Sequence, residues 1–305
     1  MDYSQILSQQ FNIKEEYAKN IITLLDDGNT IPFIARYRKE MHGSMDDQLI
    51  REFAEKLEYL RGLDKRRDEI RSLIDAQKKL TDEINLALDK AATLSELEDI
   101  YRPYRPKRKT RASIAKEKGL EPLANDILKQ EKGFDPSKSA VDYIDEEKGV
   151  TSVEDAIQGA MDIIAELVSD NAEIRKRIRN LTNANGVLVS VSTDEEKDSV
   201  YKNYYDYKEP VKKIAGHRVL AVNRGEKEGF LKVSVETDSE KPLNSIFRAM
   251  ITDKNQLCSD IIREACTDAY QRLIYPSIER EVRNDLTDTA AENAMKVFAV
   301  NLKQL

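Results

Sequence analysis

A short segment of the sequence concentrates positive charge, and it is the first candidate for chemistry. Residues 101–118 hold eight Lys or Arg and one acid, Glu117, which gives a net charge of +7. The whole chain carries −7, so everything outside the segment carries −14. Guanidinium and ammonium groups neutralise phosphates and release counterions. We therefore expect this basic segment to contact nucleic-acid phosphates without reading bases, through Arg102, Arg105, Lys107, Arg108, Lys109 and Arg111.

The same charge admits a structural interpretation. Short basic runs are common, and this one can form a solvated loop that pairs with acidic helices of its own fold. The sequence pI of about 5.3 favours that alternative. Both interpretations stay open from the residues alone.

The elements on either side of the basic segment define it as a loop. Ser95 and Glu98 have the spacing of a capping box, so we expect a helix to begin there. Pro103 and Pro106 each lack an amide donor and disfavour helical geometry in the preceding residue. The helix is therefore expected to stop near Tyr101, and a further helix is expected over residues 116–129.

The first forty residues predict three short helices separated by tight turns. Ser4 is a possible cap for the first, and Pro32 stands at a favoured early position of the third. This arrangement is similar to a helix-turn-helix, although most small units of that shape serve only packing. The third helix carries further candidate phosphate contacts, namely Arg36, Arg38 and Lys39.

A long amphipathic helix follows, with apolar residues spaced by three, four or seven from Leu49 to Leu80. Thr81 is expected to cap a partner helix through Ala92, which makes an antiparallel hairpin. We interpret the charges between the apolar positions, in RGLDKRRDEIR at 61–71, as a solvated face. A second capping box is expected at Thr151 and Glu154, and Asp170 is expected to cap the next helix.

The pattern changes near residue 187. Residues 187–191 and 230–235 are β-branched and alternating, which predicts a pair of strands. Tyrosines at 201, 204, 205 and 207 lie between them, where they either fill a packing junction or stack on bases. Helices resume at Asn255, with Pro276 kinking or restarting the chain and Thr287 capping the last helix.

These patterns predict a mainly α fold. It would combine a multi-helix body, a helix-turn-helix-like start, a long helical hairpin and a small two-stranded β insertion. We expect a helical N-terminal domain over residues 1–186, the insertion over 187–240, and C-terminal helices over 241–305. The apolar pattern runs to Leu305, so the chain is expected to continue in a longer protein.

The residues offer little chemistry beyond binding. No nucleophile elbow, glycine-rich phosphate loop or plausible Cys and His ligand set is found, so we expect no enzyme, no cofactor and no metal. Cys258 and Cys266 would lie roughly 12 Å apart on a helix, too far for a disulfide, and are expected to be core thiols. No apolar span or signal peptide is found, so we expect a cytoplasmic protein without membrane contact.

Four long motifs resemble the Tex family of bacterial transcription accessory proteins. They are TIPFIARYRKE at 30–40, LEDIYRPYRPKRKTRASIAKEKGLEPLA at 97–124, DAIQGAMDIIAE at 155–166 and YYDYKEPVKKIAGHRVLAVNRGEKEGFLKV at 204–233. They occur in the family's order and span essentially the whole chain. Arg102 and Arg105 stand where the family often has Leu and Lys, which keeps the segment basic.

The resemblance implies a role in transcription, with RNA and/or DNA and the transcription machinery as partners. It also implies continuation into an RNase H-like domain, helix-hairpin-helix units and a C-terminal OB-type RNA-binding domain. Two hypotheses follow for this chain. It is either a nucleic-acid-binding module, or a structural and protein-interaction scaffold whose nucleic acid is held by those other domains.

Overall fold

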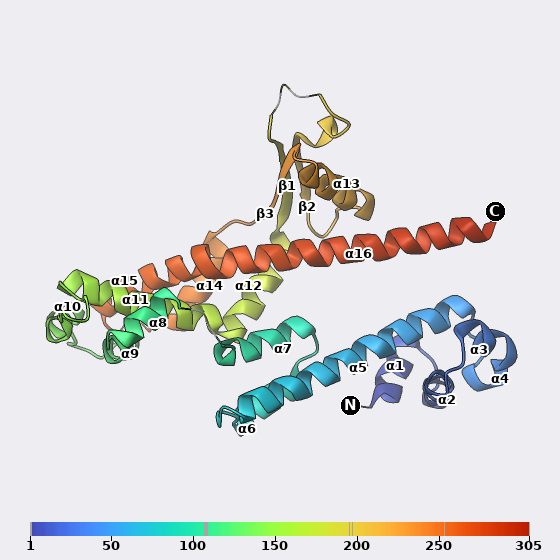
Figure 1. Ribbon diagram of the computed structural model, residues 1–305, viewed down its shortest axis with the longest axis horizontal. Helices are drawn as coiled ribbons and strands as arrows, with labels where there is room; N and C mark the ends of the chain where they lie inside the picture. The colour runs from blue at the N-terminus through green and yellow to red at the C-terminus, as the bar shows by residue number, and fades with distance from the viewer. Residues whose placement is uncertain (1, 107–108, 195, 197, 253, 305) are drawn as a thin grey trace. The chain divides into compact units, whose positions relative to one another are not determined.

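The computed structural model divides the chain into two compact units (Figure 1). The first spans Met1–Tyr104 and is helical, and the second spans Arg105–Leu305 and combines helices with a small sheet. The structure describes residues 2–106, 109–194, 196, 198–252 and 254–304. The mainly α prediction is confirmed, and each unit is described below by itself.

The first unit begins with short helices that pack on the start of a long one. Asp2 caps the first helix by accepting from the Ser4 and Gln5 amides, so the expected cap at Ser4 is wrong. Pro32 lies in the first turn of the third helix, as predicted. Leu7, Ile21 and Ile34 form the shared core with the long helix. The helices are α1 (Tyr3–Phe11), α2 (Glu15–Asp26), α3 (Ile31–Tyr37), α4 (Lys39–His42) and α5 (Asp47–Asp75).

The predicted hairpin is present after α5. Thr81 caps α6 (Asp82–Lys90) by accepting from the Ile84 amide, as expected. Thr93 caps α7 (Leu94–Tyr101), because its hydroxyl accepts from the Glu96 amide at 3.2 Å. The predicted capping box at Ser95 is therefore wrong by two positions. A single 3₁₀ turn, η1 (Arg102–Tyr104), closes the unit.

Three arginines of α5 hold this hairpin together, which corrects the expectation of a solvated face. Arg67 is buried, and it donates from Nε to the Leu88 carbonyl at 2.9 Å and from Nη2 to the Ala91 carbonyl at 3.0 Å. Arg66 pairs with Glu98 of α7 at 2.7 Å. Arg71 pairs with Asp89 of α6 at 2.7 Å. The face is therefore solvated at Arg61, Lys65, Asp68 and Glu69, whereas Arg66, Arg67 and Arg71 are part of the packing.

The second unit is built around α11 (Val153–Asp170), whose buried residues include Ile163, Ile164 and Val168. Ser152 caps this helix, one residue after the Thr151 that was expected, and Asn171 caps the next helix in place of Asp170. The surrounding helices are α8 (Arg111–Glu117), α9 (Glu121–Lys129), α10 (Pro136–Ala140), η2 (Val141–Tyr143), α12 (Ala172–Asn185), α14 (Glu240–Met250) and α15 (Gln256–Asp268). The single helix expected over 116–129 is broken at Gly119, which has φ of +84°.

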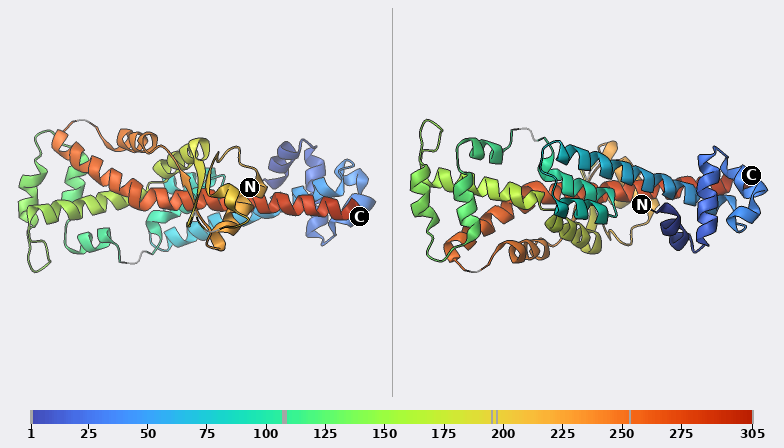
Figure 2. Two further views of the ribbon diagram at one scale, coloured as in Figure 1. Left: turned by 90° about the horizontal axis from the view of Figure 1, so that it is seen from above. Right: turned by 90° about the horizontal axis from the view of Figure 1, so that it is seen from below.

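The last helix is longer than the sequence pattern suggested. A π-helical segment, η4 (Ala269–Ile274), leads into α16 (Tyr275–Gln304), which runs as one unbroken helix in the left view of Figure 2. Thr287 lies inside α16, donates to the Arg283 carbonyl at 2.8 Å and accepts from Asn223 at 2.8 Å. The expected helix start at Thr287 is wrong, since the helix itself binds the hydroxyl. Among the described residues, no helix is both long enough and apolar enough to cross a membrane.

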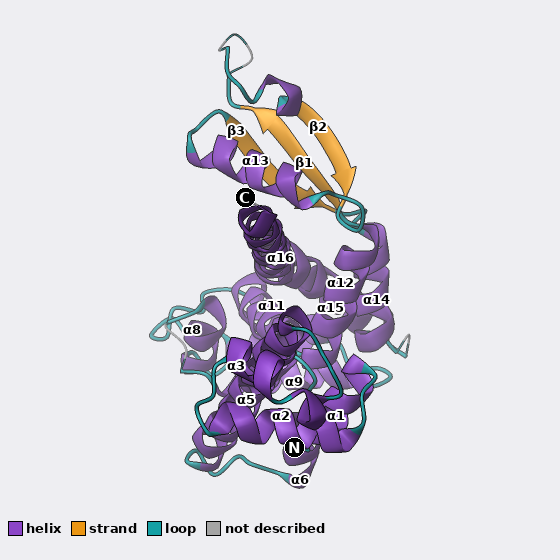
Figure 3. Cartoon of the chain, turned by 90° about the vertical axis from the view of Figure 1, so that its right-hand side faces the viewer, coloured by secondary structure: helices purple, strands orange, loops and turns teal. Residues whose placement is uncertain are grey.

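The small sheet has three antiparallel strands in the order β2-β1-β3, with α13 (Gly216–Lys227) along one face (Figure 3). The predicted strands are present as β1 (Val187–Ser192) and β3 (Leu231–Glu236). Val189 pairs with Ser234 on one side and Lys208 on the other. The third strand, β2 (Asp206–Pro210), has the sequence DYKEP, which lacks the apolar alternation that reveals a strand. A 3₁₀ turn, η3 (Lys202–Tyr204), precedes it.

The buried side-chain amides of Gln130 and Asn255 fix the turn between α14 and α15. Gln130 ends α9 in the left-handed region, and its Oε1 accepts from the Thr252 amide at 2.9 Å while its Nε2 donates to the Met250 carbonyl at 2.9 Å. Asn255 donates to the carbonyls of Glu131 and Phe134 at 2.7 and 2.8 Å. These bonds tie two segments more than a hundred residues apart.

We predict that Gln130→Ala lowers the free energy of unfolding by about 1–3 kcal/mol, because it leaves polar groups of the turn without partners. Urea unfolding at neutral pH measures the loss. Gln256→Ala is the matched control, since Gln256 is exposed and its side chain donates to Asp260 on its own helix. It should change the free energy of unfolding by less than about 0.5 kcal/mol. Equal effects of the two substitutions would contradict the role assigned to Gln130.

Candidate nucleic-acid interface

The described part of the basic segment forms a loop that leads into α8. The helix stops at Tyr101 and the 3₁₀ turn contains Pro103, as predicted. Arg102 is half-buried, whereas Arg105, Lys109 and Arg111 are exposed. Lys107 and Arg108 lie outside the described residues. Four of the six predicted contacts can therefore be placed.

Carboxylates of the second unit accompany the cations of this segment. Lys109 Nζ lies 3.6 Å from a Glu117 oxygen, and Lys116 Nζ lies 3.2 Å from a Glu121 oxygen. The Lys118 ammonium donates to the Gly149 carbonyl at 2.7 Å. The described cations are thus partly neutralised by their own fold, which is what the structural interpretation of the segment requires.

Arg111 also acts on a half-buried acid of α11. Burial raises the pKa of Asp162, while the positive charges of Arg111 and Arg272 oppose that rise. Arg272 lies on the π-helical segment, donates from Nε to Asp268 at 2.9 Å, and has Nη2 3.8 Å from Asp162. Arg111 is therefore exposed at the surface and also favours the ionised form of Asp162 at the edge of the core.

The second predicted basic group lies at the junction of α3 and α4. Arg36 and Lys39 are exposed, and within the described ranges of the chain neither forms an ion pair. The Arg38 guanidinium carbon lies 5.3 Å from the centre of the Phe33 ring, and Arg38 Nη1 is 3.4 Å from the Tyr37 carbonyl oxygen. Arg36 and Lys39 are thus open to solvent, while Arg38 packs against the Phe33 ring.

One basic run was overlooked in the sequence. Residues 175–179 read RKRIR, which is more basic per residue than residues 101–118. Arg175 and Arg179 are buried against α16, where they reach Ser277 at 3.0 Å and Glu281 at 3.1 Å. The run was visible as a charge pattern, but its position next to Ile174 and Ile178 makes two of its arginines packing residues.

The tyrosines of the small sheet lie mainly in its packing. Tyr201 is buried, and the rings of Tyr204 and Tyr207 meet edge to face with centres 5.2 Å apart. Tyr207 bonds Glu209, and Arg218 reaches the same carboxylate at 3.0 Å. These contacts favour the interpretation of the tyrosines as a filled junction over one in which they stack on bases.

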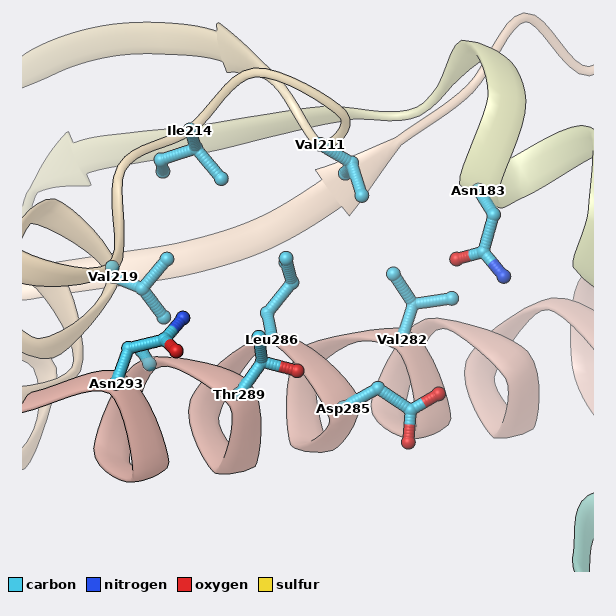
Figure 4. A pocket seen from close by; sticks show the side chains of 11 residues that line it. Asn183, Val211, Ile214, Val219, Val282, Asp285, Leu286, Thr289 and Asn293 are labelled. Atoms are coloured by element: carbon cyan, nitrogen blue, oxygen red, sulfur yellow. The ribbon is translucent and has the colours of Figure 1, made fainter. Parts of the chain in front are cut away.

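A pocket of about 200 Å³ lies between the loop before α13 and the middle of α16 (Figure 4). Its apolar side groups face one another across the space, and a carboxylate lies at its rim. Burial and the nearby charges of Glu281 and Asp288 raise the pKa of Asp285. No Lys or Arg is among the lining residues, so the pocket does not suit phosphate; they are Asn183, Val211, Ile214, Gly216, Val219, Val282, Asp285, Leu286, Thr289, Ala290 and Asn293.

The thiols and acids do not form a reactive centre. Cys258 and Cys266 are free and buried, as predicted, and burial raises the pKa of Cys266 to about 12. Across the part of the chain that the structure describes, no group of three or more His, Cys, Asp or Glu is placed to hold a metal ion.

The raised pKa of Asp162 predicts how the stability of the folded protein depends on pH. Because the ionised form is disfavoured in the folded protein, the contribution of Asp162 to stability is lost as pH rises from its ordinary pKa of 3.8 through the raised folded value. Asp162→Asn should therefore raise the melting temperature at neutral pH, and the gain should disappear below about pH 4.

Asp155→Asn on the same helix is the control with the opposite sign. A hydrogen bond from the Thr151 hydroxyl lowers the pKa of Asp155, so removing this charge should lower the melting temperature at neutral pH. Thermal melting followed by circular dichroism across pH 3–8 compares the two. A destabilised Asp162→Asn at neutral pH would contradict the assignment.

Two family models match this chain. The model of the Tex-like protein N-terminal domain matches residues 1–75, and the model of the Tex central region matches residues 131–298. Both predicted basic groups lie in or between these matches.

Individual relatives align over the complete sequence. An uncharacterized Bacillus subtilis protein, YdcI, is 43% identical over 312 residues, covering 100% of this chain and 43% of its own length. The transcriptional accessory protein Tex of Neisseria gonorrhoeae is 36% identical, covering 100% of this chain and 41% of its own. The human S1 RNA-binding domain-containing protein 1 is 32% identical, covering 100% and 32% respectively.

The chain thus spans about two-fifths of the length of the bacterial relatives. Its matches to both family models, in chain order, account for more than half of its residues. On this evidence the chain belongs to the Tex family and corresponds to the family's N-terminal domain and central region.

Proposed function

We propose that this chain is a nucleic-acid-binding module of a transcription accessory protein. The observation that carries the proposal is the pair of exposed cations, Arg36 and Lys39, which form no ion pair with any described residue. The second unit has exposed cations of its own in the predicted segment, namely Arg105, Lys109 and Arg111. The printed names of two relatives, one a transcriptional accessory protein and one an S1 RNA-binding protein, support this direction.

The contacts in this proposal are with phosphate. A charge on a flexible side chain at the surface attracts the backbone of any nucleic acid, whereas reading bases requires donors and acceptors held in a groove. Binding would therefore be independent of sequence and strongly dependent on salt. In this account the module acts in the cytoplasm, uses no cofactor and catalyses no reaction.

A scaffold is the second candidate. It is favoured by the ion pair between Lys109 and Glu117, by the action of Arg111 on Asp162, and by the net charge of −7. In that case the segment before α8 stabilises the second unit, and other parts of the longer protein hold the nucleic acid.

Two charge reversals distinguish the candidates. We expect Arg36→Glu with Lys39→Glu to weaken binding to any oligonucleotide and to reduce the slope of log K against log salt by about 2, one for each phosphate contact. Lys109→Glu with Arg111→Glu tests the second group in the same way. Fluorescence anisotropy between 50 and 200 mM salt measures both, and Lys132→Glu with Lys138→Glu reverses two exposed charges elsewhere as the control.

The outcomes separate cleanly when melting temperatures are recorded for the same variants. A Lys109 and Arg111 variant that binds normally but melts earlier would assign that segment to the scaffold. A wild-type chain that binds no oligonucleotide at 50 mM salt would remove the proposed function altogether.

A further inference from the structure

The outer face of α3 presents aromatic rings to solvent. Tyr37 is 64% exposed and Phe33 is half-buried, and the two share a face because they are four residues apart. Ile34, between the two rings in sequence, is completely buried in the core of the first unit. The core therefore fixes the helix, and the rings stand on a rigid support.

The rings are supported from the side by one another and by a cation. The centres of the Phe33 and Tyr37 rings lie 5.3 Å apart with a tilt of 41°. The Arg38 guanidinium carbon lies 5.3 Å from the centre of the Phe33 ring. Phe33 thus makes contacts within the fold, while most of the Tyr37 ring remains available to a ligand.

The charges around these rings are unequal. The stretch from Thr30 to His42 contains Arg36, Arg38 and Lys39 but only one acid, Glu40. A ligand that matches this surface is anionic and also has a flat ring. A nucleotide strand has both properties, whereas an acidic peptide or a lipid headgroup matches the charge and leaves the exposed ring unused.

We propose that this surface, formed by Phe33, Arg36, Tyr37, Arg38 and Lys39, binds single-stranded nucleic acid by stacking a base on Tyr37. Arg36 and Lys39 hold the phosphates on either side of that base. In a duplex the faces of the bases are covered by their neighbours, so this site prefers single strands. The inference rests on the proposed function and adds to it the form of nucleic acid that is bound.

A second exposed tyrosine in the same unit provides a matched comparison. Tyr59 on α5 is 43% exposed, and the Lys56 ammonium lies 4.7 Å from its ring centre. Exposed acids, Glu55 and Glu58, lie on the same part of the helix. Tyr59 therefore has an exposed ring and a nearby cation, but its sequence neighbours lack the excess of positive charge found in residues 30–42 around Tyr37.

The first test compares affinities for a labelled homopyrimidine strand and for a duplex of equal length. We expect Tyr37→Ala to weaken single-strand binding about tenfold, within the range measured when an aromatic stacking residue is removed. Duplex binding should change less than about twofold, because phosphate contacts remain. Tyr37→Phe should bind as the wild type does, and Tyr59→Ala should leave both affinities unchanged.

The second test uses the absence of tryptophan from the sequence. Tyr37→Trp and Tyr59→Trp each introduce a single fluorophore at a known surface position. A base that stacks on the indole quenches its emission, so the single strand should quench Trp at 37 strongly and Trp at 59 little. This readout reports contact directly and does not depend on a loss of stability.

The results separate the inference from the function beneath it. If reversing Arg36 and Lys39 abolishes binding while Tyr37→Ala binds the single strand normally, the proposed function stands and the stacking site is wrong. Equal losses for single strand and duplex in Tyr37→Ala, or equal quenching at 37 and 59, would also overturn the site. A wild-type chain that binds neither oligonucleotide overturns both.

Discussion

The buried guanidinium of Arg67 is the interaction on which the first unit most depends. It donates to two carbonyls at the end of α6 and pairs with Asp64 on its own helix, so a charge is placed inside the hairpin with each of its three nitrogens hydrogen-bonded. Removing the partners of such a charge is far more costly than removing an exposed pair. The path of the chain through α6 and α7 is therefore fixed by polar contacts as well as by the apolar stripe of α5.

The other cations of the chain also divide into those that are paired within the fold and those that are exposed. Arg175 and Arg179 are held by α16, and Lys109 and Lys116 lie beside carboxylates of the second unit. These cations already form hydrogen bonds or ion pairs with groups of their own fold. Arg36 and Lys39 form no ion pair among the described residues, and in the sequence they lie on either side of Tyr37, whose ring is exposed. This contrast, more than the local density of positive charge, is what favours the α3–α4 surface as the place where a polyanion binds.

The sequence predicted the class of the fold and most of its long elements, because apolar spacing is determined by burial. Helix boundaries were less certain, since neighbouring polar residues such as Thr93 and Ser95 compete to cap the same turn. The strand β2 was missed because Pro210 and its charged neighbours carry no apolar alternation. The burial of Arg67 could not be predicted, as an arginine looks the same in sequence whether it meets water or a carbonyl from another helix.

For the candidate interface, the sequence identified both basic groups but did not show which of them is the better candidate for binding nucleic acid. The interleaving of Phe33, Arg36 and Tyr37 was visible, yet only the structure shows that Tyr37 is left in solvent while Ile34 turns inward. The most direct measurement is photocrosslinking of the unmodified chain to a single strand that carries 5-iodouracil, followed by peptide mapping. The account predicts the main adduct on the peptide that contains Tyr37. Adducts confined to other peptides, such as the one containing Tyr204 and Tyr207, would contradict it.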